Sequence, residues 1–181
     1  QLCNVFEPRR AVYLSSVSNE LRTATEALLP QLRADHEAAA ALCRKMGMQS
    51  CKELREAKEI AWYRNGLAAT DLALLGTLGS VLPELEMLIL IEGSDAAAHD
   101  GVQRLAVGLG AGALPAVTYL SITDMHVGDA GASALAAALG QGALPRLKTL
   151  YLNSAAIGDA ALVALAPALR LQPALEGLYL Q

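Results

Sequence analysis

Acidic and imidazole side chains near the middle of the chain are the first candidates for chemistry. Asp124, His126 and Asp129 lie close together in the sequence, and His99 and Asp100 precede them on what could be a neighbouring loop. Carboxylate oxygens and imidazole nitrogens gathered in this way could bind a metal ion. Solvated turns and a helix cap explain the same residues equally well, so we expect no metal site.

Glycines form the next candidate motif. Gly108, Gly110 and Gly112 are spaced like a phosphate-binding loop, but no Lys-Ser or Lys-Thr pair follows them. We expect them to end a helix instead. The sequence also contains no Gly-x-Ser-x-Gly and no His-Glu-x-x-His motif. We therefore expect a protein that is not an enzyme and that binds no cofactor.

The cysteines give a prediction about the cellular compartment. Cys43 and Cys51 are eight residues apart, and no second cysteine pair completes a zinc site. With Cys3 the number is odd and the spacing fits no disulfide framework. Reduced, packed thiols are typical of a reducing environment, so we expect an intracellular, cytoplasmic protein.

Composition and charge exclude several classes of protein. Of the 181 residues, 54% are hydrophobic and 18% are charged, which indicates a folded chain. The formal net charge is −4, and residues 65–181 carry only 4 Lys and Arg against 10 Asp and Glu. Binding of nucleic acid needs a basic surface, so it is not expected. The most apolar stretch, Ala160 to Leu171, contains Pro167, and we expect no membrane-spanning segment.

The organisation of the chain follows from an internal repeat. Four prolines, Pro83, Pro115, Pro145 and Pro173, recur at intervals of 32, 30 and 28 residues. An apolar pattern of the form Leu-x-x-Leu-x-Leu starts two residues after each proline, and a weaker copy occupies residues 57–62. Because the last two apolar positions of each copy are two residues apart, each copy predicts a short strand with one buried face.

Helices are expected between these strands. Stretches rich in Ala and Leu, with leucines four residues apart, predict helices over residues 128–139 and 158–169. Asp129 and Asp159 lie where they could cap the two helices, and Gly140 and Gly142 lie where the first should end. Pro167 should kink or shorten the second helix. Stacked units of strand, loop and helix would bury faces that one unit cannot bury alone.

The repeats resemble leucine-rich repeats of the ribonuclease-inhibitor-like class. The resemblance covers residues 54–181 in about five copies, of which the last is truncated. It implies an α/β fold, namely a right-handed solenoid with parallel strands on the concave face and helices on the convex face. The family places Asn at a position that here holds Asn65, Gly93, Met125 and Ala155. We expect the C-terminal edge of the solenoid to be covered by further repeats or by another subunit.

Residues 1–53 are expected to form a helical N-terminal cap. Apolar residues at helical spacing predict two or three helices on either side of Pro30. Their apolar stripe comprises Leu14, Val17, Leu21, Leu28, Leu32, Ala39, Leu42 and Met46. The segment from Val5 to Arg22 also resembles the second half of an F-box, which implies a ubiquitin-ligase adaptor as partner. A simple amphipathic capping helix explains the same segment.

The concave face is the candidate binding surface, because strand residues between the core positions should lie there together. Its candidate partner-binding residues are Tyr63, Met87, Ile89, Ile91, Tyr119, Tyr151 and Tyr179. Tyrosine combines a large contact area with a polar tip, and an exposed apolar patch favours an interface. Alternatively, tyrosine is only a good strand residue, or the N-terminal helices cover the patch.

We therefore expect a non-catalytic scaffold that binds a protein partner, with a basic rim, on the concave face of the solenoid. Two alternatives stay open. One is an F-box-like substrate receptor of a ubiquitin ligase, and the other is an accessory structural subunit of a larger assembly.

Overall fold

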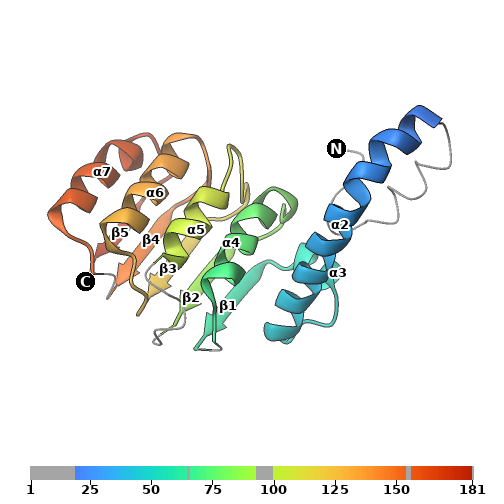
Figure 1. The fold of residues 1–181 in the computed structure, drawn as a ribbon. Coiled ribbons are helices and arrows are strands. Elements are labelled where there is room, and N and C mark those ends of the chain that lie inside the picture. Colours follow the sequence, from blue (N-terminus) through green and yellow to red (C-terminus); the bar gives the residue numbers. More distant parts are fainter. Residues whose placement is uncertain (1–18, 65, 93–99, 154–155, 181) are drawn as a thin grey trace. The chain divides into compact units, whose positions relative to one another are not determined.

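Strands and helices alternate along most of the chain. The computed structural model describes residues 19–64, 66–92, 100–153 and 156–180, and the side chains from residue 28 onward. The chain divides into two compact units, Gln1–Leu54 and Arg55–Gln181. The helices and strands are α2 (Asn19–Lys45), α3 (Cys51–Glu56), β1 (Glu59–Tyr63), α4 (Ala69–Leu78), the 3₁₀ helix η1 (Gly79–Val81), β2 (Met87–Ile91), α5 (Gly101–Gly108), β3 (Tyr119–Thr123), α6 (Gly128–Gly140), β4 (Thr149–Asn153), α7 (Asp159–Arg170) and β5 (Gly177–Leu180). Figure 1 labels all of these elements except η1.

The first unit is helical in its described part. Helix α2 runs through Pro30 without ending there. It stops where Gly47 adopts a positive φ of 73° and the N–H of Met48 donates to the carbonyl of Cys43, the usual arrangement of a glycine-ended helix. The apolar stripe is buried only toward this end: Leu42 is 2% exposed, whereas Leu28 is 54% exposed. The predicted stripe positions Leu14 and Val17, and most of the F-box-like segment, lie outside the described residues.

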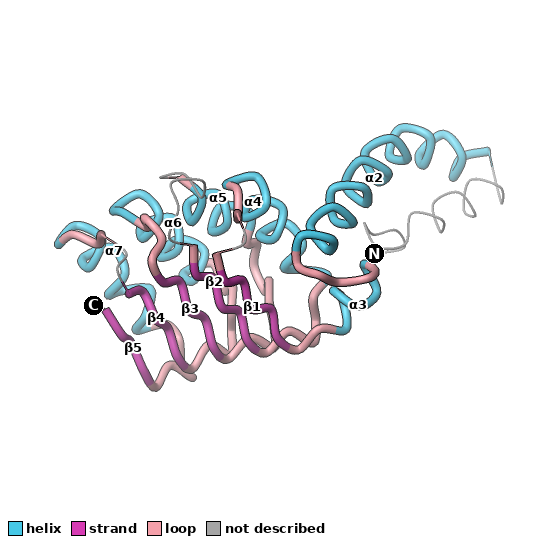
Figure 2. The backbone as a smooth tube through the Cα atoms, turned by 90° about the horizontal axis from the view of Figure 1, so that it is seen from below, coloured by secondary structure: helices cyan, strands magenta, loops and turns pink. Residues whose placement is uncertain are grey.

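The second unit is a mixed α/β structure built on one parallel sheet. Its five strands are hydrogen-bonded in chain order, β1-β2-β3-β4-β5. Helices α4, α5, α6 and α7 lie on one side of the sheet, as two views at right angles show (Figures 1 and 2). The other side of the sheet, which we call the open face, carries no helix of this unit (Figure 2).

Alternate strand residues form the core between sheet and helices. The predicted core pairs are buried, for example Leu88 and Leu90 in β2 and Leu120 and Ile122 in β3, each at most 1% exposed. Full burial of one such side chain stabilises a fold by roughly 1.5–3 kcal/mol. The sheet is in register across these positions, so the core side chains stack from strand to strand.

The same hydrogen-bond pattern joins each unit of the repeat to the next. The carbonyl before each of the first four strands accepts the N–H groups of two consecutive residues at the start of the following strand. The accepting carbonyls are those of Lys58, Glu86, Thr118 and Lys148. Repetition of this pattern at every step explains why an apolar motif at intervals of 28 to 32 residues produces strands in register.

Two of the three Leu-Pro segments of the repeat form strained turns. Leu114 and Leu144, each directly before a proline, have positive φ values of 51° and 52°, which non-glycine residues rarely adopt. Each is held there by its N–H, which donates over 2.9 Å to a carbonyl of the preceding unit, that of Gly79 for Leu114 and that of Ala113 for Leu144. These hydrogen bonds hold the turn in its strained conformation and fix where the next strand begins.

The predicted helix caps are wrong in detail. Helix α6 begins at Gly128, and its predicted cap Asp129 is the second helical residue. The Asp129 carboxylate instead accepts the N–H of Gly158, the residue directly before α7, at 3.2 Å. Asp129 thus caps the helix of the following unit. Asp159 is the first residue of α7 and makes no side-chain capping bond, although a carboxylate in the first turn still favours the helix dipole. Helix α7 continues through Pro167 to Arg170.

Candidate binding surface on the open face

The strand residues that point away from the helices form three rows across the open face. The middle row is Ala61, Ile89, Ser121, Tyr151 and Tyr179, which are direct partners in the strand register. All seven predicted partner-binding residues lie on this face: six alternate with the buried core positions of β1 to β4, and Tyr179 on β5 is the register partner of Tyr151. The strand register therefore places on one face of the sheet side chains that are up to 116 residues apart in the sequence.

The β2 side of the open face is aliphatic. Met87, Ile89 and Ile91 are consecutive outward-facing residues of β2, and all three are half-buried. Tyr63 lies beside Ile91 in the register and is 54% exposed. A contiguous apolar surface of this kind is unfavourable in water and is characteristic of a contact site.

Three tyrosines continue the surface over β3, β4 and β5. The ring centroids of Tyr119 and Tyr151 are 5.3 Å apart with a tilt of 39°, and those of Tyr151 and Tyr179 are 4.2 Å apart and nearly parallel, at 4°. Gly177 permits this stack, because a Cβ there would lie 3.0 Å from the Tyr179 ring. We call Tyr119, Tyr151 and Tyr179 the tyrosine ladder.

The environment of the ladder alters the acidity of its middle member. Partial desolvation, together with the neighbouring Tyr179 phenol, raises the pKa of Tyr151 above its ordinary value of 10. The phenol is therefore neutral at physiological pH. Its hydroxyl can donate or accept a hydrogen bond.

Small polar residues fill the space between the aliphatic side and the ladder. Ser121 lies between Ile89 and Tyr151 in the register and is only 6% exposed, since larger neighbours flank it. Its hydroxyl lies 3.2 Å from that of Thr123. The Oδ1 atom of Asn153, at the end of β4, is buried without a hydrogen-bond partner in the structure. Ser121 thus places a hydroxyl beside apolar side chains in the middle row, whereas Asn153 lies in the row at the ends of the strands.

Charges are confined to the edges of the open face. No Asp, Glu, Lys or Arg occurs at a described strand position of β2, β3, β4 or β5. Ion pairs border the strand starts, with Lys58 Nζ 3.8 Å from Glu86 Oε1 and Lys148 Nζ 3.3 Å from Glu176 Oε1. An uncharged centre with a charged border is the usual arrangement of a protein interface.

The acidic residues considered above as metal ligands have other partners. Asp124 Oδ2 lies 3.1 Å from the Arg64 guanidinium, an ion pair that joins the loops after β1 and β3. Asp129 binds the N–H of Gly158, and His126 is exposed. Over the described ranges, no three His, Cys, Asp or Glu side chains are grouped to hold a metal ion.

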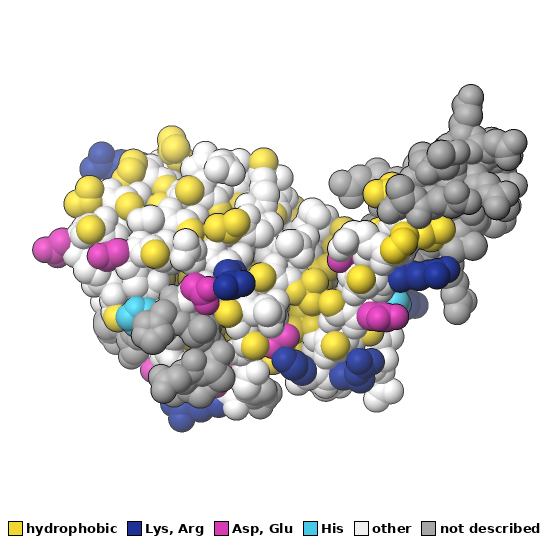
Figure 3. Space-filling view, in the orientation of Figure 1, with side chains coloured by type: hydrophobic (Ala, Val, Ile, Leu, Met, Phe, Trp, Pro, Cys, Tyr) yellow, Lys and Arg dark blue, Asp and Glu magenta, His cyan; other side chains and the backbone are white. Residues whose placement is uncertain are grey.

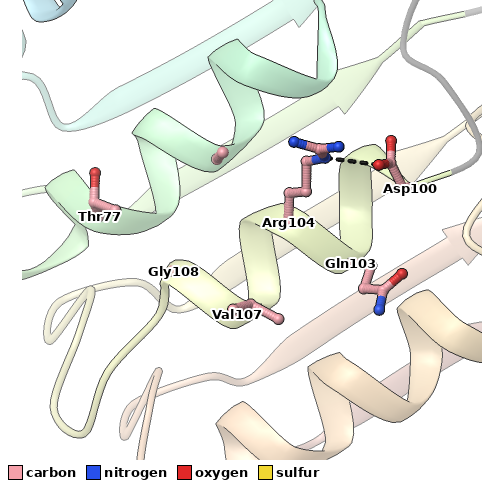
Figure 4. Close-up of a pocket in the computed structure, with 7 residues that line it drawn as sticks. Thr77, Asp100, Gln103, Arg104, Val107 and Gly108 are labelled. Atoms are coloured by element: carbon pink, nitrogen blue, oxygen red, sulfur yellow. Dashed lines mark hydrogen bonds and ion pairs between the residues drawn. The ribbon is translucent and has the colours of Figure 1, made fainter.

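A second concave region lies on the helical side. A shallow groove of about 370 Å³ lies along α4 and α5 and is lined by Thr77, Asp100, Gln103, Arg104 and Val107, among others. Figure 4 shows Arg104 reaching Asp100 at 2.7 Å, while Gln103 and Val107 point to the other side of α5. The polar groups of the groove pair with each other or point apart. His99 lies outside the described residues.

The glycines near this groove have a structural role. A Cβ on Gly76 would lie 2.3 Å from the carbonyl oxygen of Leu105, and one on Gly108 would lie 2.9 Å from the backbone of Gly76. Helices α4 and α5 therefore touch backbone to backbone. Gly108 ends α5, and Gly112 has a positive φ of 72°, so these glycines serve a helix end and a turn as expected.

One buried carboxylate was not singled out in the sequence. Glu92, directly after β2, is 3% exposed, and its Oε2 accepts the N–H of Leu67 at 2.9 Å. This bond ties the loop before α4 to the end of the next strand. In the sequence, Glu92 is only an acidic residue next to an apolar strand, and such a residue could equally be solvated.

Gln172 has a similar role near the other end of the sheet. Its buried side-chain amide donates to the carbonyls of Leu139 and Ala143, in the unit before it, at 3.2 and 3.4 Å. The core positions of the last strand are more open than those before it: Leu178 is 40% and Leu180 is 37% exposed.

Two cysteines in the described part of the first unit are packed thiols. Cys43 and Cys51 are both free and buried. Burial, together with the neighbouring Cys51 thiol, raises the pKa of Cys43 from 9.0 to about 12. A thiol with such a pKa is almost entirely protonated at neutral pH and is a poor nucleophile.

Comparison with known proteins gives no assignment: neither the protein-family models nor the curated proteins include a match to this chain. Each helix in the described ranges is too short or too polar to cross a lipid bilayer. On the side of the molecule seen in Figure 3, hydrophobic side chains are scattered over α6 and α7. The open face is accordingly the best candidate for a functional surface.

Proposed function

We propose that this chain is a non-catalytic interaction scaffold of the leucine-rich repeat type, in which the open face of the sheet binds a protein partner. The observation that carries the proposal is the continuous, uncharged surface from Met87, Ile89 and Ile91 to the tyrosine ladder. The sequential parallel strands with helices on one side support a solenoid of the ribonuclease-inhibitor-like class. In such a solenoid the open face would be concave.

The chemistry of the surface favours a protein as the ligand. Tyrosine and isoleucine side chains release water over a large area when they are covered, and tyrosine loses little conformational freedom in doing so. The phenol hydroxyls of the ladder and the Thr123 hydroxyl, which lies 3.2 Å from that of Ser121, add polar groups that could fix the orientation of the partner. The acidic excess of residues 65–181 favours a partner with basic residues around its contact site.

The test is affinity capture by the full chain and by three variants of it. Ile89→Glu and Tyr151→Glu each place a charge in the middle row of the open face. Val163→Glu places the same charge on α7, where the native side chain is already 74% exposed. We expect the first two variants to lose captured partners and Val163→Glu to keep them, with unchanged circular dichroism and melting for all three. Partners that survive both open-face variants would refute the proposal.

A further inference from the structure

The stacking of the tyrosine ladder restricts what the open face can recognise. Tyr151 has Tyr179 parallel to it at 4.2 Å and Tyr119 tilted against it at 5.3 Å, so neighbouring rings cover both faces of its ring. Stacking on a nucleic-acid base requires a free aromatic face. Tyr151 therefore offers its ring edge and phenol hydroxyl, which suit the side chains of a polypeptide.

Backbone hydrogen bonding then distinguishes two forms of polypeptide. The N–H and C=O groups of β2, β3 and β4 are used by the parallel pairing on both sides of each strand. An extended segment lying on this face would find few partners for its own backbone groups, and burying these groups unpaired is costly. An α-helix satisfies its backbone groups internally. An apolar sheet face without free backbone groups therefore favours a helix.

One helix can contact all five strands of the open face. At a strand spacing of about 4.8 Å, β1 and β5 lie about 19 Å apart, a distance that a helix crosses in about 13 residues. Strands of five residues are roughly 16 Å long, somewhat more than the diameter of a helix, about 10–12 Å.

Charge determines the polar side of that helix. The strand positions of β2 to β5 described by the structure are uncharged, whereas residues 55–181 as a whole carry 12 Asp and Glu against 7 Lys and Arg. At the border of the open face, Glu59 lies on β1, whereas Asp124 after β3 is already paired with Arg64. Basic residues beside the apolar stripe of the helix would gain from this field.

We propose that the open face binds a single basic amphipathic α-helix of about four turns, with its apolar stripe against Met87, Ile89 and Tyr151. This inference rests on the proposed function and names the partner class for the same surface. The anchors of such a helix recur at positions i, i+3 or i+4, and i+7.

Peptide selection tests this proposal. Random 16-residue peptides displayed on phage are selected on the full chain and depleted on an Ile89→Glu, Tyr151→Glu double variant, with Val163→Glu as the matched control. We expect the enriched peptides to have apolar residues at helical spacing together with Lys or Arg. Circular dichroism should show that they gain helicity on binding. A proline in the middle of a selected peptide should weaken binding by about 100-fold, whereas alanine at that position should not.

The two proposals fail in different ways. Peptides that need Ile89 and Tyr151 but alternate with a period of two, or tolerate the central proline, would refute the helix and leave the proposed function standing. A selection that yields no peptide dependent on these two residues would count against both.

Discussion

The close contact of α4 and α5 makes Gly76 the most informative site for a stability measurement. In Gly76→Ala the new Cβ would lie 2.3 Å from the Leu105 carbonyl oxygen, so α4 and α5 must separate by about 1 Å to reach ordinary van der Waals contact. Overpacking of this kind lowers the free energy of unfolding by about 1–3 kcal/mol, and the higher helix propensity of alanine offsets up to about 1 kcal/mol of this loss. We expect the free energy of unfolding to fall by about 1–2 kcal/mol.

Urea denaturation followed by tryptophan fluorescence measures this change. Trp62 is the only tryptophan, is 2% exposed and lies in β1, so its emission reports unfolding of the second unit. Gly140→Ala is the matched control, because no atom lies within 4 Å of a Cβ at this last residue of α6. Its stability should be unchanged or slightly higher. If Gly76→Ala were as stable as the native chain, the backbone contact between α4 and α5 would be refuted.

Three further predictions follow from buried or stacked groups. Glu92→Ala should lower the free energy of unfolding by about 1–3 kcal/mol, because the N–H of Leu67 loses its acceptor, and Glu92→Gln should lower it less; equal losses in urea titrations would contradict this role. In ¹³C-tyrosine NMR, Tyr151 should titrate above pH 10, and Tyr179→Ala should move its pKa back toward 10. The contribution of this raised pKa to the free energy of unfolding is present below pH 10 and is lost as the pH rises through the raised pKa. If Tyr151 titrated at or below pH 10 in the native chain, the stack would be absent. Because the pKa of Cys43 is about 12, iodoacetamide at pH 8 should label it only after unfolding, as read by peptide mass spectrometry, and rapid labelling in native buffer would contradict its burial.

The strands and their two faces were predictable from the sequence because they depend on local periodicity. Apolar residues two positions apart indicated the core face of each strand. This spacing correctly placed Leu88 and Leu90 in the core and Ile89, between them, on the open face. Leucines four residues apart likewise predicted α6 and α7 to within two residues at each end.

The contacts between units were not predictable in this way. Asp129 looks like a cap of its own helix, and only the stacking of units brings it to Gly158 of the next one. The same holds for Glu92 and Leu67, which meet across 25 residues of sequence. The tyrosine ladder needed both the register and the absent side chain of Gly177, so the sequence could assign the tyrosines to one face but not stack them.

Methyl NMR of the full chain, with labelled Ile and Met, tests most directly whether the open face binds a polypeptide. Met87, Ile89 and Ile91 report on that face, while Ile60 and Ile122 in the core serve as internal controls. On addition of a purified partner or a selected peptide, we expect the signals of Met87, Ile89 and Ile91 to shift and those of Ile60 and Ile122 to stay. A bound partner that leaves the three open-face signals in place would contradict the account.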